Sequence, residues 1–174
     1  MTYLQVVVMG VAGAGKTTIG KAVADRLGVV FVDADSLHPA SNIAKMSSGT
    51  PLNDDDRWPW LDRVGDELAA GTDGIVIACS ALKRSYRDRI RSRAAATVFV
   101  QLDGTKALLA ERLTARPGHF MPPSLLDSQL ATLEPLQRDE RGFVVNIDAT
   151  PAEIDESVVR TLSVPKWNEQ LTAS

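Results

Sequence analysis

Short apolar runs alternate along the chain with longer segments whose apolar residues recur every three or four positions. We expect five strands, at residues 4–9, 29–32, 75–79, 97–102 and 143–147. Helices are predicted between and after them, at residues 17–27, 36–49, 59–71, 82–95, 105–116, 124–133 and 150–162. This alternation predicts an α/β fold of three layers. A mostly parallel five-stranded sheet would carry helices on both faces and bind ligands at the carboxyl ends of its strands.

Proline, glycine and charge mark where these elements should begin and end. Residues 50–57 predict a charged turn, and Pro59 suits the first turn of the helix that follows. Residues 116–123 contain three prolines and one glycine, which predicts a loop long enough to be mobile. Residues 163–174 are expected to form a loosely held tail. With no repeat, linker or low-complexity block, the 174 residues are expected to form a single domain.

The first predicted loop carries the strongest chemical signal. Residues 10–17 match G-x-x-x-x-G-K-[ST] at every fixed position, and they lie between a strand and a helix as a P-loop requires. The loop amides and the helix N-terminus would bind phosphate, Lys16 would reach the β- and γ-phosphates, and Thr17 would ligate Mg²⁺. A glycine-rich turn that binds nothing is disfavoured by this context. The predicted nucleotide-binding residues here are Gly10, Val11, Ala12, Gly13, Ala14, Gly15, Lys16, Thr17 and Thr18.

Two acidic residues end the second predicted strand, close to the mouth of the P-loop. One of Asp33 and Asp35 would hold a Mg²⁺-bound water, and the other would orient an acceptor hydroxyl or take its proton. The alternative is a pair of turn aspartates that cap the next helix. Because the third strand ends in Cys79 and Ser80 rather than in a Walker-B aspartate, we favour Asp33 for the metal. Cys79 itself is expected to be buried and inert.

Several cations follow predicted strand ends. Arg57 could grip a carboxylate or phosphate with two bonds, and Lys83 lies just past the third strand. The helix after Lys83 carries Arg84, Arg87 and Arg91 on one face, which we interpret as a solvated face. The three carboxylates of residues 54–56 are interpreted mainly as a solvated helix start.

The proline-rich loop adds a second set of candidates. Arg112 and Arg116 share a helical face that leads into it, and they could supply charge to a transferring phosphoryl group when the loop closes. The alternative is a helix C-terminus that merely carries cations. His119 in the loop could bind substrate or be exposed. His38, which follows the aspartate pair, is the better placed histidine.

Composition narrows the class of protein. A net charge of −3 and an isoelectric point near 5.4 give no electrostatic reason to expect binding to nucleic acid or to an anionic membrane. A single cysteine excludes an internal disulfide and suits a reducing compartment. With no signal peptide or transmembrane pattern, a cytoplasmic protein is expected.

The motifs together resemble the gluconokinases of the small P-loop type, relatives of shikimate kinases and nucleoside monophosphate kinases. The Leu-His-Pro segment at residues 37–39, the Pro-Leu-Asn-Asp-Asp-Asp-Arg segment at 51–57 and the Cys-Ser-Ala-Leu-Lys segment at 79–83 are specific to that pattern. Residues 9–17, 33–35, 42–46, 86–88, 116–120 and 128–129 also carry the resemblance.

This resemblance implies ATP-dependent phosphorylation of D-gluconate at its 6-hydroxyl, with Mg²⁺. Lys16, Asp35 and Arg116 are the implied catalytic residues, and a lid at about residues 112–133 would close over ATP, with Arg112 on the nucleotide. A homodimer is implied as well. The residues implied for gluconate are Asp35, His38, Arg57, Lys83, His119 and Gln129.

Two alternatives stay open at this point. A kinase of the same fold could act on shikimate or on a nucleotide. A nucleotide-dependent regulatory module would bind ATP without an acceptor of its own.

Overall fold

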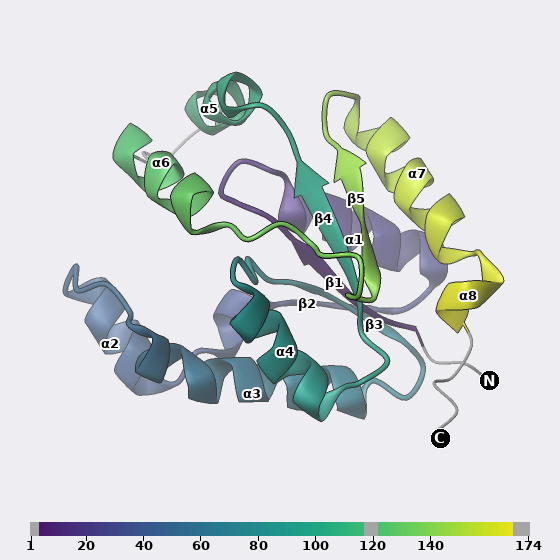
Figure 1. Ribbon diagram of the computed structural model, residues 1–174, viewed down its shortest axis with the longest axis horizontal. Helices are drawn as coiled ribbons and strands as arrows, with labels where there is room; N and C mark the ends of the chain where they lie inside the picture. Colours follow the sequence, from purple (N-terminus) through teal and green to yellow (C-terminus); the bar gives the residue numbers. More distant parts are fainter. Residues whose placement is uncertain (1–3, 117–121, 169–174) are drawn as a thin grey trace.

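The computed structural model describes residues 4–116 and 122–168. In this part of the chain the sheet is parallel throughout, with the order β2-β3-β1-β4-β5. The expected strands are confirmed, and each end lies within one residue of its prediction. Their bounds are β1 (Gln5–Met9), β2 (Val30–Asp33), β3 (Ile75–Ala78), β4 (Val98–Asp103) and β5 (Gly142–Asn146). The strand that leads into the P-loop therefore lies at the centre of the sheet (Figure 1).

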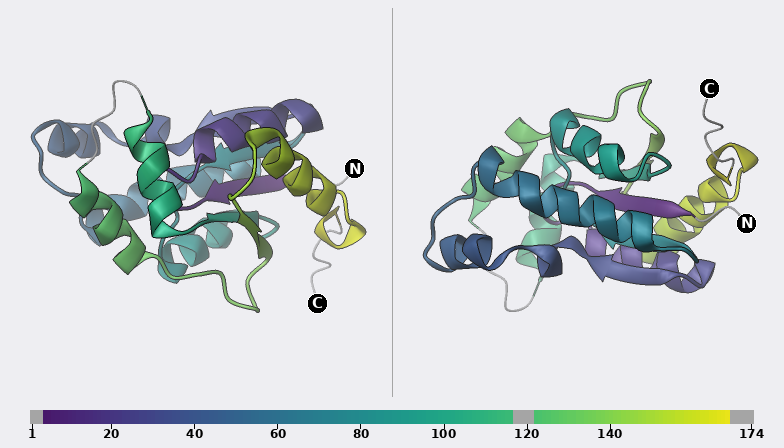
Figure 2. Two further views of the ribbon diagram at one scale, coloured as in Figure 1. Left: turned by 90° about the horizontal axis from the view of Figure 1, so that it is seen from above. Right: turned by 90° about the horizontal axis from the view of Figure 1, so that it is seen from below.

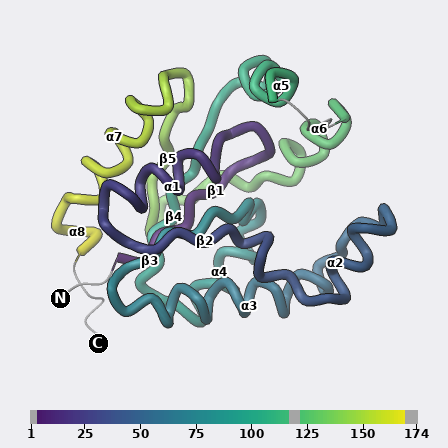
Figure 3. Tube along the Cα trace, turned by 180° about the vertical axis from the view of Figure 1, so that it is seen from behind, coloured from purple at the N-terminus to yellow at the C-terminus, as the bar shows by residue number. Residues whose placement is uncertain are grey.

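Helices cover both faces of the sheet. Helix α1 (Lys16–Leu27) packs with α7 (Pro151–Leu162) on one face, and α3 (Asp54–Ala70) packs with α4 (Arg84–Arg93) on the other. The views from above and below show the two pairs separately (Figure 2), and the trace from behind shows α1 beside α7 (Figure 3).

Strand β1 shows why two layers of helices are needed. Its side chains alternate between the faces of the sheet, as they must in a strand. Val6 and Val8 lie in the hydrophobic core with α1 and α7, whereas Val7 and Met9 lie in the core with α3 and α4. All four side chains are fully buried. The predicted three-layer α/β fold is thereby confirmed.

Helix α3 begins earlier than predicted. The expected turn at residues 50–57 is wrong in its second half, because Asn53 caps a helix that starts at Asp54. The interpretation of residues 54–56 as a helix start is confirmed. The Asn53 side chain accepts from the Asp56 backbone N–H at 2.8 Å, and the Asp56 carboxylate accepts from the Asn53 N–H at 3.0 Å. This reciprocal capping box starts the helix. Pro59 therefore lies inside α3, and not in its first turn.

The single helix predicted at residues 36–49 is also wrong. The chain forms a short 3₁₀ helix, η1 (Ala34–Leu37), and then α2 (Ala40–Ser47). Pro39 lies between them, with the extended backbone of an N-cap residue. A proline lacks the N–H that a continuous helix would need at this position.

Two further helices lie together beyond the carboxyl ends of β1 and β4. They are α5 (Lys106–Thr114) and α6 (Pro123–Thr132), and α2 lies across from them (Figure 1). Residues 117–121, which connect α5 to α6, lie outside the described residues. Within residues 4–116 and 122–168, none of the helices combines the length and apolarity that crossing a bilayer requires.

The expectation of a loose tail is wrong for its first half. Residues 165–168 form α8 (Pro165–Asn168), and the Trp167 side chain in it is buried. Arg141 donates to the Trp167 carbonyl at 2.7 Å, and the Trp167 ring lies 5.7 Å from the Phe143 ring. Burial of an aromatic ring against β5 holds this segment. Residues 169–174 lie outside the described part.

Candidate active site

The P-loop is a tight turn between β1 and α1. Gly10, Gly13 and Gly15 have φ angles of 148°, 84° and 90°, a backbone region that side chains disfavour. A Cβ atom on Gly10 would lie 2.9 Å from the Leu102 carbonyl oxygen, so glycine is also required by space there. Helix α1 starts at Lys16 with no side chain capping its N-terminus. Its first amides are therefore available to an anion.

A cavity of about 740 Å³ opens in front of this loop. From the P-loop it is lined by Ala12, Gly13, Gly15, Lys16, Thr17 and Thr18. Five predicted site residues from other elements also line it, namely Asp33, Asp35, Arg112, Arg116 and Gln129. The remaining lining residues were not predicted for the site, and they are Ile19, Ala78, Cys79, Ser80 and Pro151. Gly10, Val11 and Ala14 are not among the lining residues and instead form the buried back of the loop.

Lys16 extends along its own loop. Its ammonium group donates to the Val11 carbonyl at 3.1 Å. Burial lowers the pKa of Lys16 below its usual 10.5, although the carboxylates of Asp35 and Asp33 oppose this. Cys79, which also lines the cavity, is buried as expected, and burial raises the pKa of its thiol to about 12, which favours the protonated form.

Asp33 and Asp35 have different surroundings. One oxygen of Asp33 accepts from the Thr17 hydroxyl at 3.2 Å, and the other accepts from the Asp35 backbone N–H at 3.0 Å. Asp33 therefore caps η1 and contacts the P-loop at the same time. The Asp35 side chain is 88% exposed, and it faces the same cavity as Lys16. The described residues contain no group of three or more His, Cys, Asp or Glu side chains that could hold a metal ion.

His38 lies beneath Asp35. Its ring stacks on Trp60 with centroids 4.2 Å apart, and its Nε2 is 3.9 Å from the Asp35 carboxylate. Its Nδ1 lies 3.2 Å from the Asn42 side-chain amide nitrogen, which can only donate. The neutral ring therefore carries its proton on Nε2, toward Asp35. Burial lowers the pKa of His38 below 6.5, Asp35 opposes this, and Arg57 adds to it.

Arg57 and Lys83 meet at one carboxylate. Lys83, the N-cap residue of α4, is 3.3 Å from Asp54, and Arg57 of α3 is 3.5 Å from it. The Tyr86 hydroxyl donates to the same carboxylate at 2.5 Å. His38, Arg57 and Lys83 are not among the residues that line the cavity. Arg57 and Lys83 form a cationic pair at the Asp54 carboxylate. His38 interacts electrostatically with both Asp35 and Arg57.

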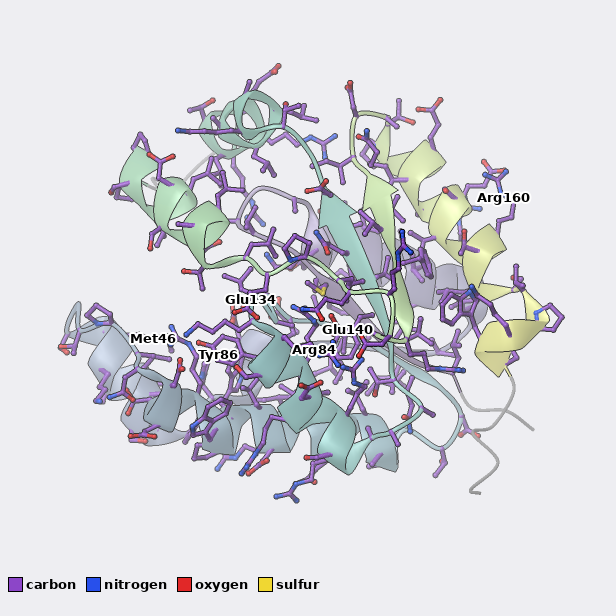
Figure 4. The ribbon with its side chains drawn as sticks, viewed as in Figure 1. Met46, Arg84, Tyr86, Glu134, Glu140 and Arg160 are labelled. Carbon is purple, nitrogen blue, oxygen red and sulfur yellow. The ribbon has the colours of Figure 1, made fainter. Side chains whose placement is uncertain are left out.

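Arg87 contradicts the expected solvated face of α4. Its side chain is fully buried, and two of its nitrogens donate to Glu140 at 2.7 and 2.9 Å. Its remaining nitrogen donates to the carbonyls of Ala81 and Leu82. Arg84 and Arg91 do remain partly exposed. Figure 4 shows Arg84, Glu134 and Glu140 gathered between α4 and the segment after α6. Through the Ala81 and Leu82 carbonyls, buried Arg87 holds the turn that precedes Lys83.

The helices on either side of residues 117–121 also reach the site. Arg112 donates to the carbonyls of Ile147 and Ala149 at 2.6 and 3.3 Å, which brings it beside the segment after β5. Arg116 lines the cavity and lowers the pKa of Lys16. The Gln129 side chain accepts from the Ala12 N–H at 2.7 Å, so Gln129 contacts the P-loop. His119 lies outside the described residues.

Comparison with known proteins identifies the family. A family model described as an AAA domain matches residues 6–136. A gluconokinase of Gluconobacter oxydans (strain 621H) is 48% identical over 158 residues, which cover 88% of this chain and 88% of that protein. This chain belongs to the gluconokinase family. The family consists of phosphotransferases, and a P-loop kinase binds ATP.

Solved structures agree with this assignment. The crystal structure of a gluconokinase from Sinorhizobium meliloti 1021 superimposes with a TM-score of 0.85 at 47% identity, covering 93% of each chain. A shikimate kinase from Acinetobacter baumannii has a TM-score of 0.60 at 19% identity and covers 95% of this chain and 96% of its own. That second likeness shows a shared fold only.

Two residues of this gluconokinase-family site were missed by sequence reasoning. Asp54 was interpreted with its neighbours as a solvated helix start, and Tyr86 was not considered as a site residue. Within the run of residues 54–56, only the contacts in the fold separate Asp54 from Asp55. The one sequence signal for Tyr86 was its spacing from Lys83, because residues three positions apart share a helical face.

Proposed function

We propose that this protein transfers the γ-phosphoryl group of ATP to the 6-hydroxyl of D-gluconate, which gives 6-phospho-D-gluconate and ADP. The observation that carries the proposal is one cavity that contains both the P-loop lysine, Lys16, and the exposed carboxylate of Asp35. Membership of the gluconokinase family supplies the identity of the acceptor.

On the nucleotide side, the P-loop amides and Lys16 would bind the phosphates, and the partly desolvated ammonium would regain a counter-charge from them. Thr17 and Asp33 would hold Mg²⁺ together with phosphate oxygens and water, because hard cations prefer oxygen ligands. Arg116 would stabilise the transferring phosphoryl group, and Arg112 would contact the nucleotide.

On the acceptor side, Asp35 would accept or orient the proton of the 6-hydroxyl, and the Nε2–H of His38 would position that carboxylate. Arg57 and Lys83 would bind the carboxylate at the other end of the sugar acid. His38 interacts electrostatically with Asp35 and with Arg57, which suits an acceptor that is polar at both ends.

Residues from about 112 to 133 would act as a lid that keeps water from the γ-phosphate, with His119 meeting the substrate. Because Gln129 accepts a hydrogen bond from the Ala12 N–H, we propose that Gln129 links the lid to the P-loop when the lid closes. We also propose that the chain forms one domain and that it lies in the cytoplasm, which suits a single buried cysteine. We propose a homodimer as well, and sedimentation analysis would test that oligomeric state.

The activity is tested by following ADP release from ATP and Mg²⁺ in the presence of D-gluconate, shikimate or a nucleoside monophosphate. We expect release to depend on D-gluconate, and we expect Lys16→Ala to abolish it. Much faster turnover of shikimate or of a nucleotide would overturn the acceptor assignment. ATP binding with no acceptor-stimulated ADP release would favour a regulatory module instead.

A further inference from the structure

The carboxylate of Asp54 is shared by three donors from two helices. Arg57 lies one turn further along α3, whereas Lys83 and Tyr86 belong to the start of α4. Lys83 approaches one carboxylate oxygen at 3.3 Å, and Arg57 and Tyr86 approach the other. The Tyr86 hydroxyl, followed by Lys83, holds the pKa of Asp54 below its usual range, so the group is ionised at neutral pH. The two helices thus meet at a single negative charge.

Without that charge, two cations would be left close together. The Arg57 guanidinium carbon lies 5.7 Å from the centre of the Tyr86 ring, and the Lys83 ammonium nitrogen lies 5.4 Å from it. Both cations also lie within 3.5 Å of the Asp54 carboxylate, which they share as a counter-ion. Like charges repel, and long flexible side chains that lose a shared counter-ion can move apart into solvent. About a third of each side chain is exposed, at 31% for Arg57 and 34% for Lys83, so both have room to move.

The neighbouring acidic residues have other surroundings. Asp56 accepts from Lys45 and completes the cap of α3. Asp55 is exposed, although it belongs to the same first turn of the helix. All three aspartates of residues 54–56 are favoured by the helix N-terminus. Of the three, only Asp54 forms ion pairs with Arg57 and Lys83.

We propose that Asp54 is a positioning residue, which holds Arg57 and Lys83 side by side so that the carboxylate of the acceptor meets a preformed pair of cations. This inference rests on the proposed function, in which the acceptor is a sugar acid. Asp54 needs no contact with the acceptor for this role. By ordering the two cations before the acceptor binds, Asp54 would reduce the side-chain conformational entropy that is lost on binding.

The role predicts a specific kinetic pattern. Asp54→Asn keeps the size of the side chain but removes its charge. We expect the KM for D-gluconate to rise about tenfold or more, with kcat changing less than about threefold, since the reacting groups at Asp35 and Lys16 are untouched. The dissociation constant of an ATP analogue should stay unchanged. The matched control, Asp55→Asn, removes the same charge from the same helical turn and should leave both kinetic parameters unchanged.

Tyr86→Phe provides a second variant that keeps all charges and removes one donor. We expect an increase in the KM for D-gluconate smaller than that of Asp54→Asn. The inference is overturned if Asp54→Asn leaves this KM equal to that of Asp55→Asn, or lowers it as a purely repulsive carboxylate would. If the wild-type protein fails to phosphorylate D-gluconate, it is the proposed function that fails, so the two failures are distinguished by the wild-type assay.

Discussion

At the scale of single residues, Asp33 and Asp35 lie two positions apart but have surroundings that suit different chemical roles. Asp33 is held by Thr17 and by a backbone amide, which leaves it little freedom to exchange protons with a substrate. Asp35 keeps its carboxylate open to the cavity, with the Nε2 of His38 3.9 Å away. A residue that must meet a mobile hydroxyl needs this openness, whereas a residue that helps to hold a metal ion does not.

Asp35→Asn should lower kcat by at least about 10²-fold, a loss typical of removing an acid–base group, while ATP still binds. Steady-state kinetics and a titration with an ATP analogue measure the two effects separately. Asp73→Asn is the control, because it removes an equal charge from an exposed turn before β3, at the opposite end of the strands. A near-normal kcat for Asp35→Asn would remove Asp35 from the mechanism.

Residues whose role follows from local spacing could be predicted from the sequence. The P-loop and the two aspartates at and just after the end of β2 are set by short segments, and the cavity brings most of them together. Asp54, Tyr86 and the buried Arg87 could not be predicted in this way. Tyr86 and its partner Asp54 are 32 residues apart in the sequence, and Arg87 and its partner Glu140 are 53 apart. The pattern of charges along one helix does not reveal such distant pairs.

At the scale of elements, the P-loop is braced by both helices that flank residues 117–121. A Cβ atom on Gly13 would lie 2.9 Å from the Leu109 carbonyl oxygen of α5. Gln129 of α6 accepts from Ala12, and Lys106 of α5 is 2.6 Å from Asp127 of α6. A displacement of α6 would therefore be transmitted to the phosphate-binding amides.

Gln129→Leu removes the acceptor for the Ala12 N–H at nearly constant size. Without this hydrogen bond the nucleotide itself must order the loop. A net hydrogen bond is worth about 0.5–1.5 kcal/mol, so we expect nucleotide affinity to fall about two- to tenfold, with a smaller effect on the KM for D-gluconate. Isothermal titration with an ATP analogue measures the first. Ser128→Ala, an exposed neighbour, is the control. If the KM for D-gluconate rises and nucleotide affinity does not change, Gln129 belongs to the acceptor site instead.

The type of most elements was predictable, and several of their boundaries were not. Helix α3 starts before Pro59 because an asparagine and an aspartate form the capping box, in place of the usual serine or threonine with glutamate. Residues 165–168 are helical because Trp167 finds a site against Phe143, which no local signal indicates.

At the scale of the whole molecule, a buried ion pair joins the middle of the chain to its last strand. Arg87 and Glu140 are both buried, and Glu140 also accepts from the Gln137 N–H at 2.9 Å. The pair ties α4 and the turn after β3 to the segment that enters β5. The parallel sheet could be predicted from the alternation of elements, but its order could not, because alternation does not say which strands are neighbours.

Arg87→Met should destabilise the protein by about 3–5 kcal/mol, because the buried Glu140 charge loses its two closest charged donors and keeps only Arg91, at 3.3 Å, and the Gln137 N–H. The double variant Arg87→Met with Glu140→Leu should recover much of that loss, since replacing both charges by apolar groups is often nearly neutral. Urea denaturation at pH 7 measures the free energies of unfolding. A double variant no more stable than the single one would show that the pair itself supplies the stability.

In the proposed reaction, one cavity holds the terminal phosphate of ATP on Lys16 and the acceptor hydroxyl on Asp35. The most direct measurement is a crystal structure with D-gluconate and a non-hydrolysable ATP analogue. We expect the 6-hydroxyl oxygen about 2.6–3.2 Å from the Asp35 carboxylate, directly or through one water, with the terminal phosphate on Lys16. Phosphates bound elsewhere, or an Asp35 carboxylate turned to bulk solvent away from the sugar, would contradict this proposal.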